Sequence, residues 1–424
     1  MNMSKSVQNV GGEAASGKIT PYQKIVVAIL AFMQFTVILD FMVLSPLGAT
    51  LMPALKITPT QFGSVVSIYA LSAGISGFLA AGFADRFDRK KLLLFFYVGF
   101  IAGTMLCALA STFEFLLVAR MVTGIFGGVI GSIVFAITTD LFEFEHRGRV
   151  LGIIQTSFSA SQILGIPFGL WLTNRLNWHA PFWMIVGVGA LAGVVVFSFV
   201  KPIDAHLKFR IDKKPLHHLM VTMTNQNYLK AFATTALLAT GGFMLMPFGS
   251  AFSVNNMKID INDLPSIYLI TGLSSMFMGP FLGRISDAVG KYHVFLFGSI
   301  LTMTMVFIYT TRGVTPLYTV MAINVLLFTG VSARMISSSA LVSAIPSREN
   351  RGSFMSVSSS IQQLSGGLAS LLAGFIVSEN PDGSLHNFEM LGYVVNGASV
   401  ITLVMMAFIH RLVPESEKQA REAS

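Results

Sequence analysis

Two charged residues stand inside apolar runs of the chain. Asp40 lies in V-I-L-D-F-M-V-L, and Arg120 lies in L-L-V-A-R-M-V-T-G. At 1.5 Å per residue, Asp40 lies ~13 Å and Arg120 ~7 Å from the outer ends of their predicted helices, so a long arginine side chain can bridge the difference. Charge inside a bilayer is costly and normally has a partner or a wet cavity. A carboxylate between apolar surroundings and a guanidinium can exchange a proton when its surroundings change.

We therefore expect Asp40 and Arg120 to couple proton or substrate movement. A structural charge pair is the alternative, and Arg120 alone could instead snorkel to the outer interface. Arg334, in V-S-A-R-M-I-S-S-S, is another charge within a span. It either faces a cavity, where it would meet an anionic substrate, or snorkels toward the cytoplasm. Uncharged polar residues inside spans are candidates for a substrate cavity or for helix-to-helix hydrogen bonds: Gln34, Tyr69, Gln155, Gln162, Asn255, Asn324, Gln362, Gln363 and Asn396.

The elements that must position these residues are twelve stretches of about 20 or more mostly apolar residues, the length that crosses a bilayer as a helix. The stretches do not alternate apolar and polar residues as barrel strands do. Hydrophobic residues make up 53% of the chain and charged residues 11%, against about 25% charged in soluble domains. The sequence predicts an all-α membrane protein with transmembrane helices at about 24–49, 62–84, 91–111, 115–139, 149–173, 181–200, 228–253, 265–285, 292–311, 316–343, 352–378 and 388–411.

Basic residues mark one set of helix ends. All but six of the 28 lysines and arginines fall at alternating ends of the spans and at the termini. The exceptions are Lys56, Arg175, Lys258 and Arg312 at the other ends, and Arg120 and Arg334 within spans. This asymmetry predicts that both termini are cytoplasmic. It also explains the net charge of +8 without nucleic acid, which is not an expected partner. The single cysteine, Cys107, is expected to be an inert packing residue.

The two halves of the chain repeat. Asp287 follows Asp85 by 202 residues in similar loops, and Arg351 follows Arg147 by 204 residues in another similar pair. Two landmarks at nearly one offset predict six-helix halves of the same orientation. The predicted organisation is a flexible tail (1–23), an N-terminal bundle (24–200), a linker (201–227), a C-terminal bundle (228–411) and a C-terminal tail (412–424). The linker is either a helix on the inner leaflet or a solvated connection.

The first loop, G-F-A-D-R-F-D-R-K-K at residues 82–91, resembles the signature between helices 2 and 3 of the major facilitator superfamily. The resemblance implies a cytoplasmic gate that locks the outward-facing state, formed by Gly82, Asp85, Arg86, Arg89, Asp287 and Lys291. Ala288 stands at the position that matches Arg86, so the second copy of the lock is expected to be weaker. The alternative is a loop that only sets topology.

Two further motifs extend the resemblance. L-L-V-A-R-M-V-T-G-I-F-G-G, at 116–128, is similar to the helix 4 signature of proton-coupled members, although Thr123 stands where the family often has glutamine. S-A-S-Q-I-L-G-I-P-F-G-L-W-L, at 159–172, resembles the helix 5 signature of the antiporters, most of all in the sugar- and drug-efflux branch that includes arabinose efflux permeases. Gly165, Pro167 and Gly169 carry that match. Proline bends a helix and glycine permits close packing, which suits a gating helix or an ordinary kink.

These observations predict a secondary active transporter, a proton-coupled exporter of small apolar or amphipathic compounds that works by alternating access. A sugar or metabolite exporter of the same fold is the alternative, and a non-transporting receptor or scaffold is the remote one. No P-loop and no enzyme constellation is present in the sequence, and neither cofactor nor metal is expected. The expected partners are a small-molecule substrate, protons and the lipid bilayer. We expect a monomer in a bacterial inner membrane.

Overall fold

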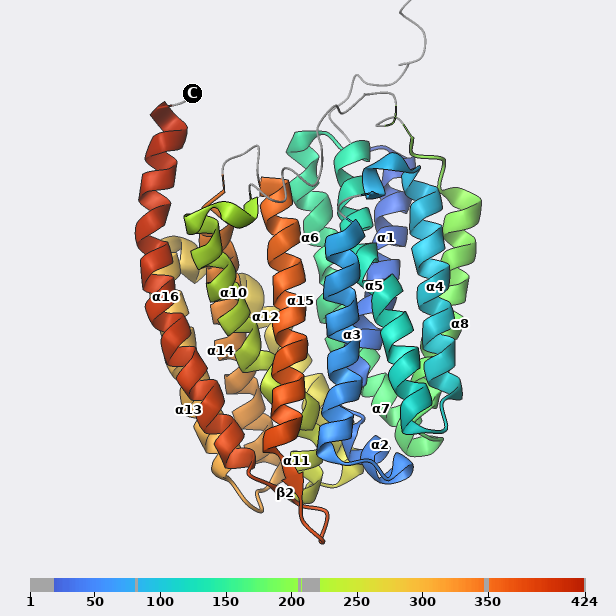
Figure 1. Cartoon of the computed structure of the whole chain (residues 1–424), viewed down its shortest axis with the longest axis vertical. Helices are drawn as coiled ribbons and strands as arrows, with labels where there is room; N and C mark the ends of the chain where they lie inside the picture. The colour runs from blue at the N-terminus through green and yellow to red at the C-terminus, as the bar shows by residue number, and fades with distance from the viewer. Residues whose placement is uncertain (1–18, 81–82, 205–206, 208–221, 347–350, 423–424) are drawn as a thin grey trace, which may run out of the picture.

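Apolar helices form nearly all of the structure (Figure 1). A computed structural model describes residues 19–80, 83–204, 207, 222–346 and 351–422. The N-terminal half contains α1 (Pro21–Val43), α2 (Gly48–Leu55), α3 (Pro59–Ala80), the short turn η1 (Ala84–Arg86), α4 (Arg89–Leu109), α5 (Phe113–Leu141), α6 (Phe144–Ala160), the π-helical turn η2 (Ser161–Gly165), α7 (Ile166–Arg175) and α8 (Ala180–Phe199).

The C-terminal half repeats this arrangement. It contains α10 (Gln226–Leu245), η4 (Met246–Phe248), α11 (Gly249–Asn255), η5 (Ile261–Asp263), α12 (Leu264–Val289), α13 (Lys291–Thr311), α14 (Leu317–Ser343), α15 (Arg351–Ile376) and α16 (Phe388–Glu422). A small hairpin of β1 (Ser378–Glu379) and β2 (Leu385–His386) joins α15 to α16. Helix α16 continues past the predicted end of the last span at residue 411, because apolarity alone defined that prediction. Most of the predicted linker lies outside the described residues.

Local capping explains where several helices begin. Thr20 and Gln23 form a reciprocal capping box at the start of α1, with Pro21 at its first position. The Asp88 carboxylate accepts from the backbone N–H of Lys91 and so caps α4. Between these starts, apolar residues predominate.

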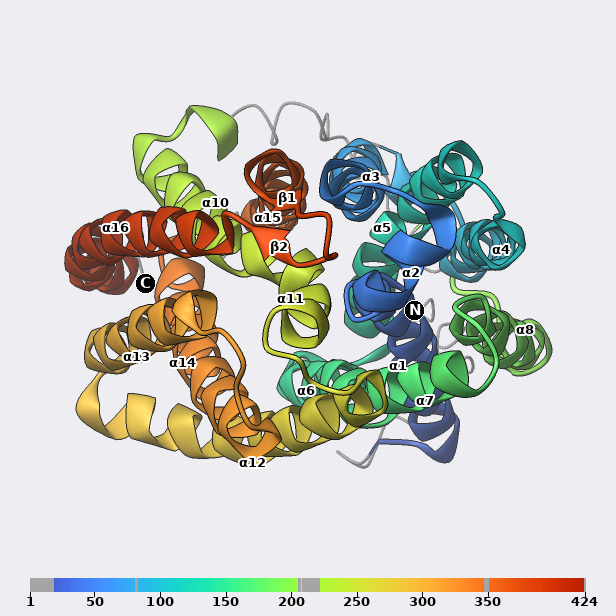
Figure 2. The same ribbon diagram turned by 90° about the horizontal axis from the view of Figure 1, so that it is seen from below.

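Eleven helical segments in the described chain are long and apolar enough to cross a membrane. The remaining long helix, α15, spans 26 residues but includes Gln362, Gln363 and several serines, so it is more polar. It packs along α3 at the boundary between the halves, where protein rather than lipid covers part of its surface. With α15 included, the predicted all-α fold of two six-helix halves is confirmed (Figure 2).

The halves meet most closely at one end of the bundle. We call the end at which α3, α8 and α12 finish, beside Arg86, Lys201 and Lys291, the basic end, and the other end the opposite end. At the opposite end, Thr60 Oγ1 on α3 donates to the Gly374 carbonyl on α15 at 2.6 Å. Asn174 Nδ2, on α7, donates to the Ile261 carbonyl at 3.0 Å. Figure 2 shows α3 beside α15 and α7 beside α12. Ile261 lies in η5, the short turn that leads directly into α12.

Two broken helices close the opposite end. The first span is interrupted between α1 and α2 at Pro46, and the seventh between α10 and α11 at Pro247, 201 residues later. Proline removes a backbone donor and disfavours a continuous helix. The broken ends touch, because Ser250 Oγ donates to the Ser45 carbonyl at 3.1 Å. The described conformer is therefore closed at the opposite end.

Farther toward the basic end, the glycines of α12 no longer face the N-terminal half closely. A Cβ built on Gly272 would lie 3.0 Å from Ile163 of η2, across the boundary between the halves. A Cβ built on Gly279 or Gly283, two and three turns later on α12, would have nothing within 4 Å. Gly148 and Gly152 on α6 also border open space. The helices that touch near the middle of the bundle thus present open surface toward its basic end.

Candidate functional site

Asp40 and Arg120 form a buried ion pair in the N-terminal half. Arg120 Nη1, on α5, donates to Asp40 Oδ2, on α1, at 2.8 Å and also lies 3.3 Å from the Asp40 carbonyl oxygen. The side chains are 1% and 0% exposed. The guanidinium therefore turns inward onto the carboxylate and does not reach the outer interface.

Two other helices complete the surroundings of the pair. Thr104 Oγ1, on α4, lies 3.1 Å from Asp40 Oδ1 and 3.0 Å from its own helix's Phe100 carbonyl. The Arg120 guanidinium carbon lies 4.4 Å from the centre of the Tyr69 ring, on α3. Aromatic faces attract cations at such distances. Four helices of one half thus converge on a single charged pair.

The hydrogen bonds favour a charged carboxylate in this conformer. Oδ1 of Asp40 accepts from Thr104 and Oδ2 accepts from Arg120, so each oxygen already faces a donor. A proton on Oδ2 would face the Arg120 N–H and break that bond, whereas a proton on Oδ1 could be donated to the Thr104 hydroxyl, which would then donate to the Phe100 carbonyl. Arg120 Nε has no hydrogen-bond partner in the described part of the chain. Separation of Arg120 from Asp40 would remove the positive charge that favours the charged carboxylate.

The helix 5 motif packs directly against the helix that carries Asp40. A Cβ on Gly165 would lie 2.5 Å from Leu39 Cδ1, and a Cβ on Gly169 would lie 3.2 Å from Val43. The π-helical turn η2 ends at Gly165, and Pro167 follows within the first turn of α7. Such turns insert one residue into the helical ladder and often mark functional positions. The motif is thus an irregular helical segment that packs against α1, the helix that carries Asp40.

The loop motif is only partly described. Gly82 and the side chain of Asp85 lie outside the described residues, as does the side chain of Arg351. Arg86 is exposed. Arg89 is buried, and its Nε donates to Asp140 Oδ2 on α5 at 3.0 Å.

In the second copy, Asp287 contacts Lys291 one turn away, on the surface. Arg89 thus clamps the start of α4 to the end of α5, while an exposed pair such as Asp287–Lys291 contributes little stability.

The predicted cavity residues differ in their surroundings. Tyr69 joins the ion pair, and Gln162 is buried in η2 beside Gly272 of α12. Gln34 lies near Gly131 of α5, with its Oε1 unpartnered among the described residues.

The other candidates differ in hydrogen-bond partner and in exposure. Asn324 donates to the Val320 carbonyl of its own helix, Gln155 is exposed, and Gln362 is half-buried on α15. Asn255 and Asn396 donate to the carbonyls of Gly383 and Met303, and Gln363 is half-buried. Arg334 is buried within the C-terminal half.

Sequence reasoning missed several contributors. Thr104 binds Asp40, Asp140 binds Arg89, and the Pro46 and Pro247 breaks form the closed end. The two prolines recur at nearly the same offset as the loop landmarks, so the repeat itself could have revealed them. Nothing in the sequence near Thr104 distinguishes it from other threonines in the spans.

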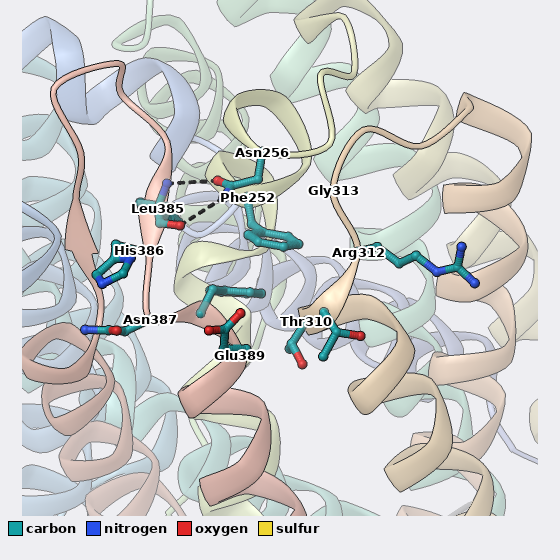
Figure 3. A pocket seen from close by; sticks show the side chains of 11 residues that line it. Phe252, Asn256, Thr310, Arg312, Gly313, Leu385, His386, Asn387 and Glu389 are labelled. Carbon is teal, nitrogen blue, oxygen red and sulfur yellow. Dashed lines mark hydrogen bonds between the residues drawn. The ribbon is translucent and has the colours of Figure 1, made fainter.

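A pocket of about 240 Å³ opens at the opposite end of the C-terminal half (Figure 3). It lies between the hairpin, the end of α11 and the turn that follows α13. Asn256 holds the hairpin through two bonds with the Leu385 backbone, at 2.8 and 2.9 Å. Glu389 and Arg312 also line it. None of the predicted cavity residues lines this pocket, and it is separate from the Asp40–Arg120 pair.

The fold and the repeated motifs agree with comparisons to known proteins. The model of the Major Facilitator Superfamily matches residues 30–311 and 231–424. The chain belongs to this superfamily. Multidrug resistance protein 3 of Bacillus subtilis is 32% identical over 152 residues, which are 36% of this chain and 30% of that protein. A probable sugar efflux transporter of Mannheimia succiniciproducens is 21% identical over 252 residues, 59% of this chain and 62% of the relative.

A solved structure shows the same fold. The nucleoside transporter NupG superposes with a TM-score of 0.72 at 14% identity, covering 91% of this chain and 99% of that one. Membership in the superfamily makes this chain a membrane transporter of small molecules rather than an enzyme.

Proposed function

We propose that this chain is a proton-coupled antiporter that exports small apolar or amphipathic compounds by alternating access. The observation that carries the proposal is the ion pair between Asp40 and Arg120, fully buried among four helices of one half. Charged groups at such depth are expensive, and in membrane proteins they are usually functional.

In this proposal Asp40 carries the proton and Arg120 controls when it can bind. While the pair is intact, the carboxylate stays charged and paired. Movement of α1 relative to α5 separates the pair, and Asp40 then takes up a proton. The irregular segment at Gly165 and Pro167 packs on α1 beside Asp40, so a change in that segment would reach the ion pair directly.

Alternating access would use the end that is now closed. The broken ends at Pro46 and Pro247, and the contact of α3 with α15, would separate to open the opposite end. The loop that contains Asp85 and Arg86 would then close the basic end, which we expect to be cytoplasmic. Both termini would lie in the cytoplasm of a bacterial cell, and the transporter would act in the inner membrane as a monomer.

The substrate class rests on the relatives and on side-chain composition. A relative named for multidrug resistance favours apolar or amphipathic compounds. The chain's 36 phenylalanines and 23 methionines supply adaptable apolar surface. A relative named as a probable sugar efflux transporter favours sugar or metabolite export as the second candidate.

Proteoliposomes with an acidic lumen test the proposal. We expect an apolar fluorescent dye to accumulate inside as protons leave, and a protonophore to abolish the accumulation. Radiolabelled sugars in the same vesicles test the second candidate. The proposal fails if no apolar compound moves in response to a pH gradient, or if dye accumulation is unaffected by the protonophore.

A further inference from the structure

Arg334 is a buried cation in the C-terminal half. It lies on α14, and the residue is only 4% exposed. Its Nη1 lies 3.4 Å from Ser399 Oγ on α16, and its guanidinium carbon lies 5.9 Å from the ring centre of Phe295 on α13. The Nε and Nη2 atoms are closed off from solvent and have no hydrogen-bond partner among the described residues. Buried charged donors without partners are strongly unfavourable, so this arrangement calls for an anion.

No carboxylate of the described chain fills that role. Arg120 in the other half has Asp40, whereas no carboxylate lies within 4 Å of Arg334 in the part of the chain that the structure describes. The sequence of the C-terminal spans explains this. Asp287 stands at the basic end of α12, where it contacts Lys291, and Glu389 stands at the opposite end of α16. Arg334 lies nine residues inside α14, ~14 Å from its basic end.

The two unpartnered donors have a specific geometry. Nε and Nη2 are on the same edge of a guanidinium and point in parallel, which is the fork that binds both oxygens of a carboxylate. The remaining nitrogen, Nη1, lies 3.4 Å from Ser399 Oγ on another edge of the guanidinium, so this hydrogen bond leaves the Nε and Nη2 fork free. A planar anion with two oxygens matches the free edge better than a single-atom anion does.

Glycine leaves room beside the guanidinium. A Cβ on Gly241 of α10 would lie 4.0 Å from Arg334 Nη1 and 3.8 Å from Ser399 Oγ, at ordinary contact distance. The neighbouring Gly242 is exposed, and a Cβ there would have nothing within 4 Å. The α10 backbone at Gly241 therefore lies beside Nη1 and Ser399 without a side chain of its own between them.

We propose that Arg334, Ser399 and the α10 backbone at Gly241 form a binding site for a carboxylate group. The ligand is an amphipathic organic acid whose carboxylate binds the Nε and Nη2 fork and whose apolar part lies near Phe295 of α13. This names a substrate class for the exporter and, in that respect, rests on the proposed function. The binding site itself depends only on the C-terminal half.

Thermal unfolding of the purified protein in detergent tests the site. The single cysteine, Cys107, is buried, so a fluorogenic maleimide reports unfolding without any added label site. Benzoate is the probe, benzyl alcohol its uncharged analogue, and chloride the single-atom anion. We expect benzoate, but neither of the others, to raise the Tm saturably.

Three variants locate the effect. Arg334→Gln keeps a donor for Ser399 but loses the fork, and should weaken benzoate binding about ten- to a hundredfold, the size of a lost charged hydrogen bond. Gly241→Ala narrows the site without a clash and should also weaken binding. The control is Gly193→Ala, on α8 in the other half. It adds the same methyl group, 3.7 Å from Tyr97, and should bind benzoate like the wild type.

The outcomes separate the two proposals. A benzoate effect that is absent, or that persists in both Arg334→Gln and Gly241→Ala, overturns the site, and an Arg334-dependent effect of chloride alone overturns the carboxylate assignment. If Arg334→Gln does not fold, Gly241→Ala decides. Benzoate binding should survive Asp40→Asn, so a failure of proton coupling leaves this site standing and is distinguishable from its failure.

Discussion

Gly63 on α3 offers a direct way to open the closed end. It faces the backbone of α15 across the boundary between the halves, where a Cβ would lie 2.9 Å from the Ser370 carbonyl oxygen and 3.2 Å from the Gly374 Cα. The neighbouring bond from Thr60 to the Gly374 carbonyl spans the same contact. Because backbone atoms cannot rotate away, Gly63→Ala should force α3 and α15 apart and favour the conformer that is open at the opposite end.

The magnitude follows from the overlap. Ordinary contacts begin near 3.4 Å, so the helices must separate by about 0.5 Å. Overpacking of this kind costs about 1–3 kcal/mol, which corresponds to a shift of about 5- to 150-fold between two conformers. A substitution of glycine by alanine within a helix also stabilises the helix by up to about 1 kcal/mol. A control variant must therefore carry the same substitution in a helix. Gly187→Ala, on α8 away from the boundary between the halves, provides it, since a Cβ there meets nothing within 4 Å.

A cysteine probe at the broken ends reads the conformer. Ser250→Cys places a thiol at the contact with Ser45, where the native residue is 1% exposed. A membrane-impermeant maleimide, added on the side of the opposite end, should label the probe faster in Gly63→Ala than in Gly187→Ala. The native Cys107 is buried and adds little background. Equal labelling in the two variants, or slower labelling in Gly63→Ala, would refute the reasoning.

Other parts of the chain give further tests. Arg89→Met and Asp140→Asn should each lower the Tm, and the double variant should lose less than the sum, because both remove one buried clamp. Burial lowers the pKa of His179, so stability should fall as the pH drops through about 6.5, and His179→Gln should flatten that decline in a Tm series. Asn256→Ala should speed amide exchange at Leu385 in the hairpin, measured by mass spectrometry, while α13 stays unchanged.

The fold followed from the sequence because bilayer physics limits the choices. Long apolar segments must be helices, and repeated loops at nearly one offset fix two halves of the same orientation. The approach of Arg120 to Asp40 could be anticipated because helix rise converts sequence position into depth. Tyr69 was only one of several polar candidates, because depth alone does not tell which face of a helix a side chain occupies.

Tertiary packing explains what sequence reasoning could not supply. Apolar periodicity is weak in spans that are apolar all round, so it does not show which way a polar side chain points. The sequence therefore did not predict that Asn324 donates to a carbonyl of its own helix, or that Arg334 is buried within the C-terminal half. The breaks at Pro46 and Pro247 were missed because proline is tolerated in membrane helices when neighbours satisfy the freed groups. The contact of their ends, through Ser45 and Ser250, depends on how two halves meet, which composition does not encode.

The central claim is that Asp40 carries the coupled proton. Asp40→Asn keeps the shape of the side chain but cannot exchange a proton, and Thr104→Val is a matched control that removes a hydrogen bond to Asp40 while keeping the carboxylate. The measurement is substrate accumulation in proteoliposomes under an imposed pH gradient, with Tm values to show that both variants are folded. We predict that Asp40→Asn abolishes gradient-driven accumulation and that Thr104→Val retains it. A well-folded Asp40→Asn protein that still uses the pH gradient to concentrate substrate would contradict the account.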